Sequence, residues 1–549
     1  MRRILGSGLL LFALSATTLP ATAVPVAAGR ESARSTAWST HSTQQARRAD
    51  RALTQAREAL AGHGRDATMA LVALRAAYPH LSASGKRQAD ALFARPTDGD
   101  APPSSGGDPQ GDGYDYDGSN GTGVAVDAVP LCGVHICIHY VTGSDDAPEP
   151  TDTTPADGIP DWVQLTLDEM EAVWTYEVGT RGYRAPASDE TATNNGGDAK
   201  LDVYLANVSG DGLYGYCAPE APVGPTPTER YRGYGYCVLD DDYVGFPTPP
   251  EGSLKVTAAH EFFHMIQFNY DAFEDHWIME ATATWMEERF ADDVNDNRFY
   301  LADSQMHVPS VPLDKFGNAC CQQYGNWIFF ERLSKRYGVD FVRTLWQRMD
   351  TLSGPDDYSV LALRNLLAAH GTTFTKFYTG FAAGNLFPQK FYEEGGHYSD
   401  DRAPITTGWN FTPRLRFLNT RKTVLSHLTS RNYAFRPSAK MTGTWYLTVK
   451  VDGPDQVGNI AAPAGAEVII VKKSGAITTK LIPLNTQGVG KVKIAFGAGV
   501  VKYATLTLVN GSTHYTNCYP MNNPTEWSCN GGTPDPGKTY KFSAVASRP

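Results

Sequence analysis

The stretch Ala259-His260-Glu261-Phe262-Phe263-His264 decides the fold, and it lies in a mostly apolar run, residues 257 to 268, that contains no proline or glycine. Such a run predicts a buried α-helix. Residues four apart lie one turn apart on a helix, so the imidazoles of His260 and His264 can bind one ion. Glu261 points to the side, where its carboxylate can reach a metal-bound water without being a ligand.

A catalytic zinc needs a third protein ligand and an open position. Metzincins would place a histidine six residues after His264, but that residue is Tyr270, so this class is excluded. Glu280 is the better candidate, because it lies in a second apolar helical stretch, Trp277 to Trp285, where a lone carboxylate is costly unless it binds a positive group. The alternative is that Glu280 is a partly exposed helix carboxylate.

Two more glutamates follow in the same stretch. Glu287 and Glu288 are expected on a solvated face of the helix. Glu287 lies two turns after Glu280, so a role in supporting a metal ligand is the alternative for it.

The motif His-Glu-x-x-His followed by a glutamate in a second helix resembles the gluzincin group of zinc metallopeptidases. The wider run from Tyr234 through the zinc helix to Asn297 resembles a family of secreted bacterial metalloproteases of the myxobacterial and actinobacterial type. The resemblance implies a zincin-like catalytic domain, with Glu280 as the third zinc ligand. The spacing from His264 to Glu280 is shorter than in the best-known gluzincins, and Thr284 stands where thermolysin-like members have an aspartate supporting a ligand histidine.

These residues predict a zinc-dependent endopeptidase that acts on protein or peptide substrates. Zinc held by His260, His264 and Glu280 would lower the pKa of its water, and Glu261 would act as the general base. The alternative is a secreted binding or adhesion protein with a structural or inactive metal site. Glu261 discriminates between the two, because a structural metal would not need it.

Residues 1–23 read as a signal peptide, with Arg2 and Arg3 before an apolar run and Ala21-Thr22-Ala23 as a cleavage site. No later stretch reaches about 18 apolar residues, so we expect a secreted, extracellular protein without a membrane anchor. Eight cysteines are typical of an oxidising compartment. The simplest local bridges are Cys132 to Cys137, Cys217 to Cys237 and Cys518 to Cys529, which leaves Cys320 and Cys321 unassigned.

Residues 24–96 form a leader with predicted helices at 43–61, 67–78 and 82–93. Between Arg30 and Pro96 it has eleven Lys and Arg against five Asp and Glu, whereas the whole chain carries a net charge of -11. A basic leader before an acidic body suggests a propeptide that docks electrostatically and closes the site. A solvated helical hairpin without an inhibitory role is the alternative. Nucleic acid is excluded as a partner, because an acidic body would repel phosphate.

The rest of the chain predicts an α+β protein. Residues 97–123 are rich in Gly, Asp, Ser and Pro and are expected to be a linker. Residues 124–413 would form the zincin-like domain. Residues 414–549 contain short β-rich runs with turns every eight to twelve residues, which predict an all-β sandwich. We expect a monomer.

Within 124–413, the alternating run Lys200 to Ala206 is expected to be the edge strand above the cleft, where substrate backbone pairs. A Tyr-, Gly- and Pro-rich stretch from Gly212 to Pro250 reads as a loop. The acidic turns at 157–161 and 292–297 offer oxygen ligands that would suit a structural Ca²⁺ ion, although turn chemistry alone also explains them.

Overall fold

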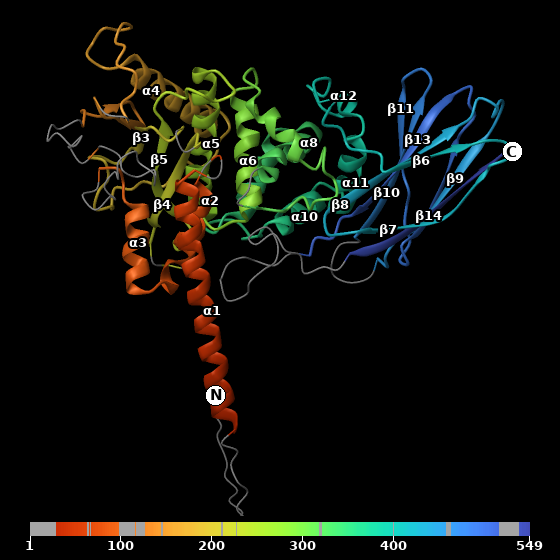
Figure 1. Ribbon diagram of the computed structural model, residues 1–549, viewed down its shortest axis with the longest axis horizontal. Helices are drawn as coiled ribbons and strands as arrows, with labels where there is room; N and C mark the ends of the chain where they lie inside the picture. The colour runs from red at the N-terminus through yellow and green to blue at the C-terminus, as the bar shows by residue number, and fades with distance from the viewer. Residues whose placement is uncertain are drawn as a thin grey trace, which may run out of the picture.

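The computed structural model describes residues 29–62, 65, 67–97, 116, 127–143, 146–209, 212–224, 226, 228–317, 321–398, 400–456, 463–514 and 537–549, with side chains of the first helix from residue 43. Helices and strands are both abundant, which agrees with the α+β expectation (Figure 1). The signal peptide, Cys518 to Cys529 and the linker other than Thr97 and Tyr116 lie outside the described residues.

A five-stranded sheet organises the first half of the protein, with the strand order β1-β2-β3-β5-β4. Strands β2, β3 and β5 are parallel, and β4 and β1 are antiparallel to their neighbours. The strands are β1 (Leu131–Cys132), β2 (Ile136–His139), β3 (Leu201–Ala206), β4 (Gly215–Pro222) and β5 (Gly233–Asp240).

Two expectations about this sheet are wrong. The run Lys200 to Ala206 supplies β3, which is central, and the edge strands are β1 and β4. The stretch expected to be a loop from Gly212 to Pro250 instead contains the antiparallel pair β4 and β5. Its Tyr-, Gly- and Pro-rich composition hides the pairing, which brings Cys217 opposite Cys237.

The sheet is covered on both faces, because side chains of successive strand residues point to opposite sides. Val203 and Leu205 belong to the core shared with α4 (Asp161–Trp174), α5 (Pro250–Asp271) and α6 (His276–Phe290). Tyr204 and Ala206 face a second core, which they share with the leader helices. Those helices are α1 (Gly29–Leu60), α2 (Thr68–Ala77) and α3 (Ala83–Phe93), red to orange in Figure 1.

Helices α5 and α6 form the central pair. Apolar residues are spread around the whole circumference of both helices, and such helices are buried on all sides. From Trp277 to Glu288 every residue of α6 is buried. The remaining helical elements of this half are η1 (Tyr78–His80), η3 (Thr175–Thr180), η5 (Asp296–Asp303), α7 (Gln322–Gly325), α8 (Trp327–Tyr337), α9 (Asp340–Met349), α10 (Val360–Ala369), α11 (Phe374–Gly384) and α12 (Pro388–Phe391).

The C-terminal part consists of two sheets around one apolar core, at the blue end of Figure 1. One sheet has the order β11-β10-β13-β8-β6, and the other has the order β12-β9-β14-β7. Their strands are β6 (Thr407–Phe411), β7 (Phe417–Leu425), β8 (Thr429–Pro437), β9 (Tyr446–Asp452), β10 (Ala464–Lys472), β11 (Ile477–Leu481), β12 (Val489–Ala495), β13 (Val501–Asn510) and β14 (Lys538–Ser547).

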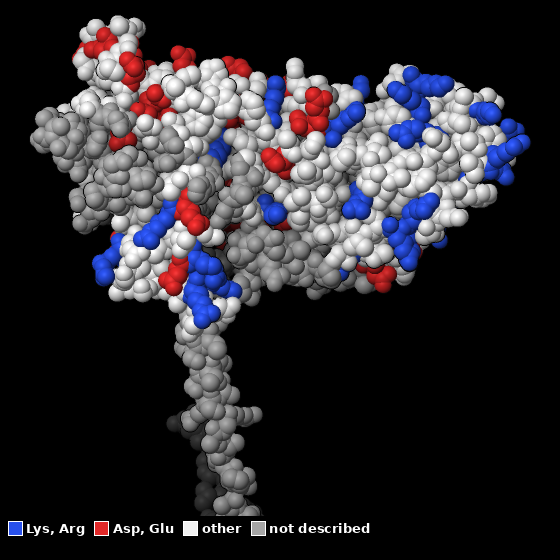
Figure 2. Space-filling model, in the orientation of Figure 1, with Lys and Arg blue, Asp and Glu red and all other residues white. Residues whose placement is uncertain are grey.

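Charge is distributed unevenly along the body. Residues 414–549 contain seventeen Lys and Arg against five Asp and Glu, so the expectation of an acidic body does not hold for this part. Figure 2 shows Lys and Arg gathered over the C-terminal strands, with acidic side chains concentrated towards the other end. The acidic excess therefore belongs to residues 97–413, which carry the candidate metal ligands.

Two of the expected disulfides are present, Cys132 to Cys137 and Cys217 to Cys237. Cys321 is also disulfide-bonded, and Cys320 lies outside the described residues. Among the described helices, none is long and apolar enough to cross a membrane.

Candidate metal centre

Three side chains from α5 and α6 converge in the interior. His260 and His264 lie one turn apart on α5, and Glu280 projects from α6. One ligand atom from each residue can be chosen so that all three lie within 4.8 Å of one another. Oε2 of Glu280 lies 3.3 Å from Nε2 of His260 and 3.8 Å from Nε2 of His264. The structure therefore brings together the three residues that were predicted from the sequence as metal ligands.

This donor set fits a zinc ion. Zinc accepts two imidazole nitrogens and one carboxylate oxygen in catalytic sites, with bonds of about 2.1 Å. Ligand atoms in a tetrahedral site of that size lie about 3.4 Å apart, which is close to the two separations from Glu280. All three side chains are at most 1% exposed, and burying this combination of groups without a cation between them would be costly.

Each histidine is oriented through its other ring nitrogen. Nδ1 of His260 lies 2.6 Å from Oε1 of Glu287, and Nδ1 of His264 lies 2.8 Å from Oε1 of Gln267. Because both partners are acceptors, each Nδ1 carries the hydrogen and each Nε2 presents its lone pair towards Glu280. Gln267 is held in turn, since its Nε2 donates to the carbonyl of Met279 at 2.9 Å.

The expectation of a solvated face for Glu287 and Glu288 is wrong, because they are 1% and 3% exposed. Glu288 accepts a hydrogen bond from Nδ2 of Asn297 at 2.6 Å. Glu287 is instead the partner of His260, as its two-turn spacing from Glu280 allowed. Burial raises the pKa of Glu287, whereas the neighbouring Arg65 guanidinium lowers it and so favours the charged carboxylate. Gln267 was not foreseen, although its position three residues after His264 places it on the same face.

Glu261, the expected general base, is 1% exposed and contacts the leader. Its Oε2 accepts a hydrogen bond from the hydroxyl of Thr68 at 3.2 Å. The same hydroxyl accepts the backbone N–H of Cys217 at 2.9 Å. Thr68, at the start of α2, thus lies between β4 and the carboxylate of Glu261, the expected general base.

Three arginines fasten the leader to the body. Arg65 pairs with Glu287 at 2.8 Å, and Nε of Arg75 donates to the carbonyl of Pro219 at 2.9 Å. Arg95, which is fully buried, pairs with three carboxylates, those of Asp189, Asp202 and Glu220. All three arginines lie on the side of the leader that faces the sheet and α6.

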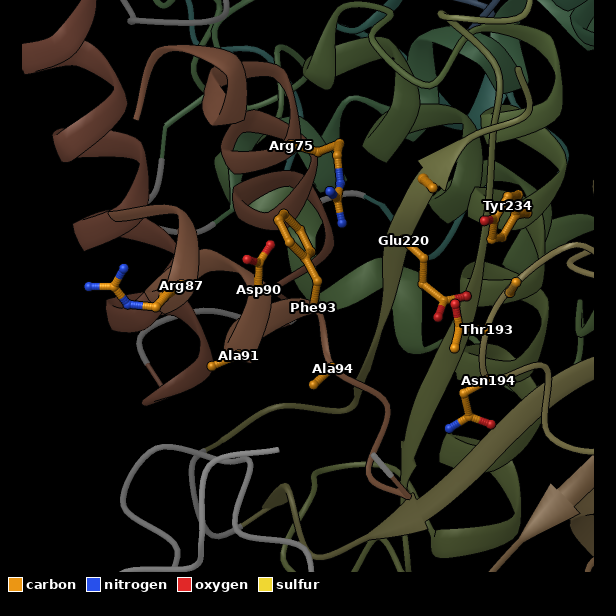
Figure 3. A pocket seen from close by; sticks show the side chains of 12 residues that line it. Arg75, Arg87, Asp90, Ala91, Phe93, Ala94, Thr193, Asn194, Glu220 and Tyr234 are labelled. Carbon is orange, nitrogen blue, oxygen red and sulfur yellow. The ribbon is translucent and has the colours of Figure 1, made fainter. Parts of the chain in front are cut away.

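A pocket of about 750 Å³ lies along this junction (Figure 3). Arg87, Asp90 and Phe93 line it from α3, and Glu220 and Tyr234 line it from β4 and β5. The pocket separates the two parts beside the ion pairs of Arg95.

Two other groups of potential ligands occur among the described residues. One contains Cys132, Cys137 and Asp198, but its cysteines are joined in a disulfide. The other contains Asp240, Asp241 and Asp242. Neither coincides with an expected calcium turn.

The acidic turns make hydrogen bonds within the protein. Asp161 accepts the N–H groups of Thr153 and Thr154 at 3.0 and 2.9 Å. In the second turn, Asp296 accepts from Thr248. A calcium ion at these turns stays a prediction.

Comparisons with known proteins add little to this geometry. No family model and no curated protein matches the chain. Among solved structures, the pre-peptidase C-terminal domain of a collagenase from Bacillus anthracis matches 26% of this chain and 96% of its own, at 12% identity and a TM-score of 0.15. The family GH115 4-O-methyl-α-glucuronidase BtGH115A matches 67% of this chain and 54% of its own, at 10% identity and a TM-score of 0.14. Neither likeness is strong enough to assign a fold or an activity.

Proposed function

We propose that this protein is a secreted zinc-dependent endopeptidase with a zincin-like catalytic part. The observation that carries the proposal is the convergence of His260, His264 and Glu280, with Glu261 one residue away on the same helix. The two disulfides agree with an oxidising compartment. A His₂Glu set with an adjacent glutamate is typical of catalytic zinc sites that hydrolyse peptide bonds.

The residues of the chain have distinct tasks in this reaction. Bound zinc would supply a polarised water and a Lewis acid for the scissile carbonyl. Glu261 accepts the proton of the attacking water and delivers it to the leaving amine. Glu287 and Gln267 keep the ligand histidines in the tautomer that presents Nε2.

The leader acts as a propeptide in this proposal. Thr68 contacts the general base, and residues of α2 pack in the same core as the zinc helix. Substrate cannot reach Glu261 while Thr68 occupies this position. Activity therefore requires that the leader be cut and withdrawn, and Arg47-Arg48 and Lys86-Arg87 are candidate positions for the first cut.

A paired comparison of variants tests the proposal. The protein, activated by limited proteolysis of its leader, is expected to digest casein in a chelator-sensitive manner. Glu261→Gln should retain zinc and the fold but lose digestion by a factor of about 10² or more, because the proton acceptor is gone. Normal digestion by this variant would contradict the mechanism. Stoichiometric zinc with no digestion by the activated wild type would favour the binding or adhesion protein.

A further inference from the structure

The guanidinium of Arg65 fills a socket built by the body. Its nitrogens lie 2.8 Å from Oε1 of Glu287 and 3.5 Å from Oδ2 of Asp296. Its central carbon lies 4.9 Å from the ring centres of both Tyr214 and Tyr300 and 5.7 Å from that of Tyr324. We call these five residues, Tyr214, Glu287, Asp296, Tyr300 and Tyr324, the cation socket. Arg65 itself is only 5% exposed.

The walls of the cation socket are fixed by contacts within the body. Glu287 is bonded to His260, and Asp296 accepts a hydrogen bond from Thr248 at 2.5 Å. The rings of Tyr300 and Tyr324 pack against each other at 5.5 Å. The socket therefore adjoins the candidate metal centre through Glu287. Contacts within the body, and not only contacts with the leader, hold its walls in place.

The backbone beside the socket is bonded to the body next to an edge strand. The carbonyl of Arg65 accepts the backbone N–H of Tyr214 at 2.9 Å, just before the edge strand β4. Three residues further on, Thr68 contacts both Cys217 and Glu261. Extended peptides commonly bind proteins by pairing with an edge strand while their side chains enter pockets. Here the side chain of Arg65 enters the cation socket, and the side chain of Thr68 reaches the expected general base, Glu261.

We propose that the cation socket is a substrate subsite for a cationic side chain, which takes arginine in preference to lysine and which Arg65 occupies until the leader departs. This inference rests on the proposed peptidase function. A planar guanidinium can pair with two carboxylates and lie over aromatic rings at once, whereas an ammonium is a compact charge. After withdrawal of Arg65, the carboxylates of Glu287 and Asp296 would be left together without the guanidinium that pairs with both, which favours capture of another cation.

Binding to the full-length Arg65→Ala variant tests the socket without relying on catalysis. The probes are N-acetyl-arginine methylamide and its citrulline counterpart, which has nearly the same shape but no charge. At millimolar concentration the arginine compound should raise the unfolding midpoint of the variant by about 2 °C or more, and the citrulline compound should not. The unfolding midpoint of the wild type, whose socket is filled by Arg65, should shift less than that of the variant with the arginine compound. Equal shifts with both compounds, or no shift, would overturn the proposal.

Two further measurements extend this test. In the Arg65→Ala background, Asp296→Asn should weaken the response to the arginine compound. If Arg65→Ala does not fold, hydrogen exchange of the wild type serves instead, because the arginine compound should compete with Arg65 and accelerate exchange in α2 more than the citrulline compound does. Equal acceleration by both compounds would overturn the proposal.

Peptide cleavage separates the subsite from the proposed function. Zinc-loaded Arg65→Ala, activated by limited proteolysis of its leader, is offered matched quenched peptides that differ only by arginine or citrulline. The arginine peptide should be cleaved about tenfold faster or more, as expected for one additional ion pair. Equal cleavage would overturn the subsite. Binding of the arginine compound with cleavage of neither peptide would overturn the peptidase function and leave the cation socket supported.

Discussion

The carboxylate of Glu287 joins the leader to the candidate metal centre, because its Oε1 lies 2.6 Å from Nδ1 of His260 and 2.8 Å from Nη2 of Arg65. One side chain thus orients a ligand histidine and also holds the leader. Removal of the leader and the properties of the metal centre are therefore coupled through a single carboxylate.

Glu287→Gln should weaken zinc binding, since an amide is a poorer acceptor for the His260 N–H and supplies no charge. Loss of such a supporting contact typically costs 10- to 100-fold in metal affinity. Competition with a fluorescent chelator measures this change. The matched control is Glu288→Gln, a neighbouring buried glutamate that bonds Asn297 and should leave zinc affinity unchanged. Equal losses in both variants would indicate a general effect on α6.

Thr68→Val should loosen the leader, because valine keeps the shape of threonine but removes the hydroxyl shared by Glu261 and Cys217. One lost hydrogen bond of this kind costs about 1 kcal/mol. The variant should release its leader faster in limited proteolysis. Thr54→Val is the control, since Thr54 is exposed and its hydroxyl donates to the carbonyl of Asp50 within α1. Identical release rates for the wild type and Thr68→Val would argue against a docking role for this hydroxyl.

Arg95→Met should strongly destabilise the protein. It leaves Asp189, Asp202 and Glu220 buried or half-buried without their common cation. Breaking a buried ion pair by removing one partner costs about 3–5 kcal/mol. Urea unfolding measures the loss. Arg87→Met, an exposed arginine on α3, should be close to neutral, and a similar loss in both variants would contradict the role given to Arg95.

Asp241→Asn should stabilise the protein at alkaline pH in the presence of a chelator. Burial, followed by the charges of Asp240 and Asp242, raises the pKa of Asp241 from 3.8 to about 8. The folded wild type therefore keeps a proton that the unfolded chain loses. Its stability is full below pH 3.8 and falls as the pH rises through 8, by at most about 1.4 kcal/mol per pH unit.

Asparagine at this position does not titrate, so the advantage of the variant should grow between pH 5 and pH 8.5. Thermal unfolding at these two pH values measures it. An advantage that is absent at pH 8.5, or larger at pH 5, would contradict the raised pKa.

Local sequence rules predicted the candidate ligands, because helical spacing places His260 and His264 one turn apart whatever surrounds them. Local sequence rules gave wrong predictions where contacts between distant parts of the chain determine the structure. The central position of β3 depends on a strand order that no local pattern reveals. Glu287 is buried because α6 is covered on every side, which includes contact with Arg65 from a distant part of the chain. Its two-turn spacing from Glu280 was the one signal available.

For the leader too, local features could be predicted from the sequence and long-range contacts could not. Its helices and its basic excess could be predicted from composition and periodicity. The contact between Thr68 and Glu261 could not, since it requires the docking of α2 against β4. Charge counting also missed the basic C-terminal strands, because the net charge of the whole chain conceals a strongly acidic middle.

The central claim is that one zinc ion lies between His260, His264 and Glu280. Anomalous diffraction at the zinc absorption edge, from crystals of the full-length protein, tests it most directly. The account predicts a single strong peak about 2.0–2.2 Å from Nε2 of both histidines and from a carboxylate oxygen of Glu280. No peak at this position in zinc-supplemented protein, or a peak bound by other side chains, would contradict it.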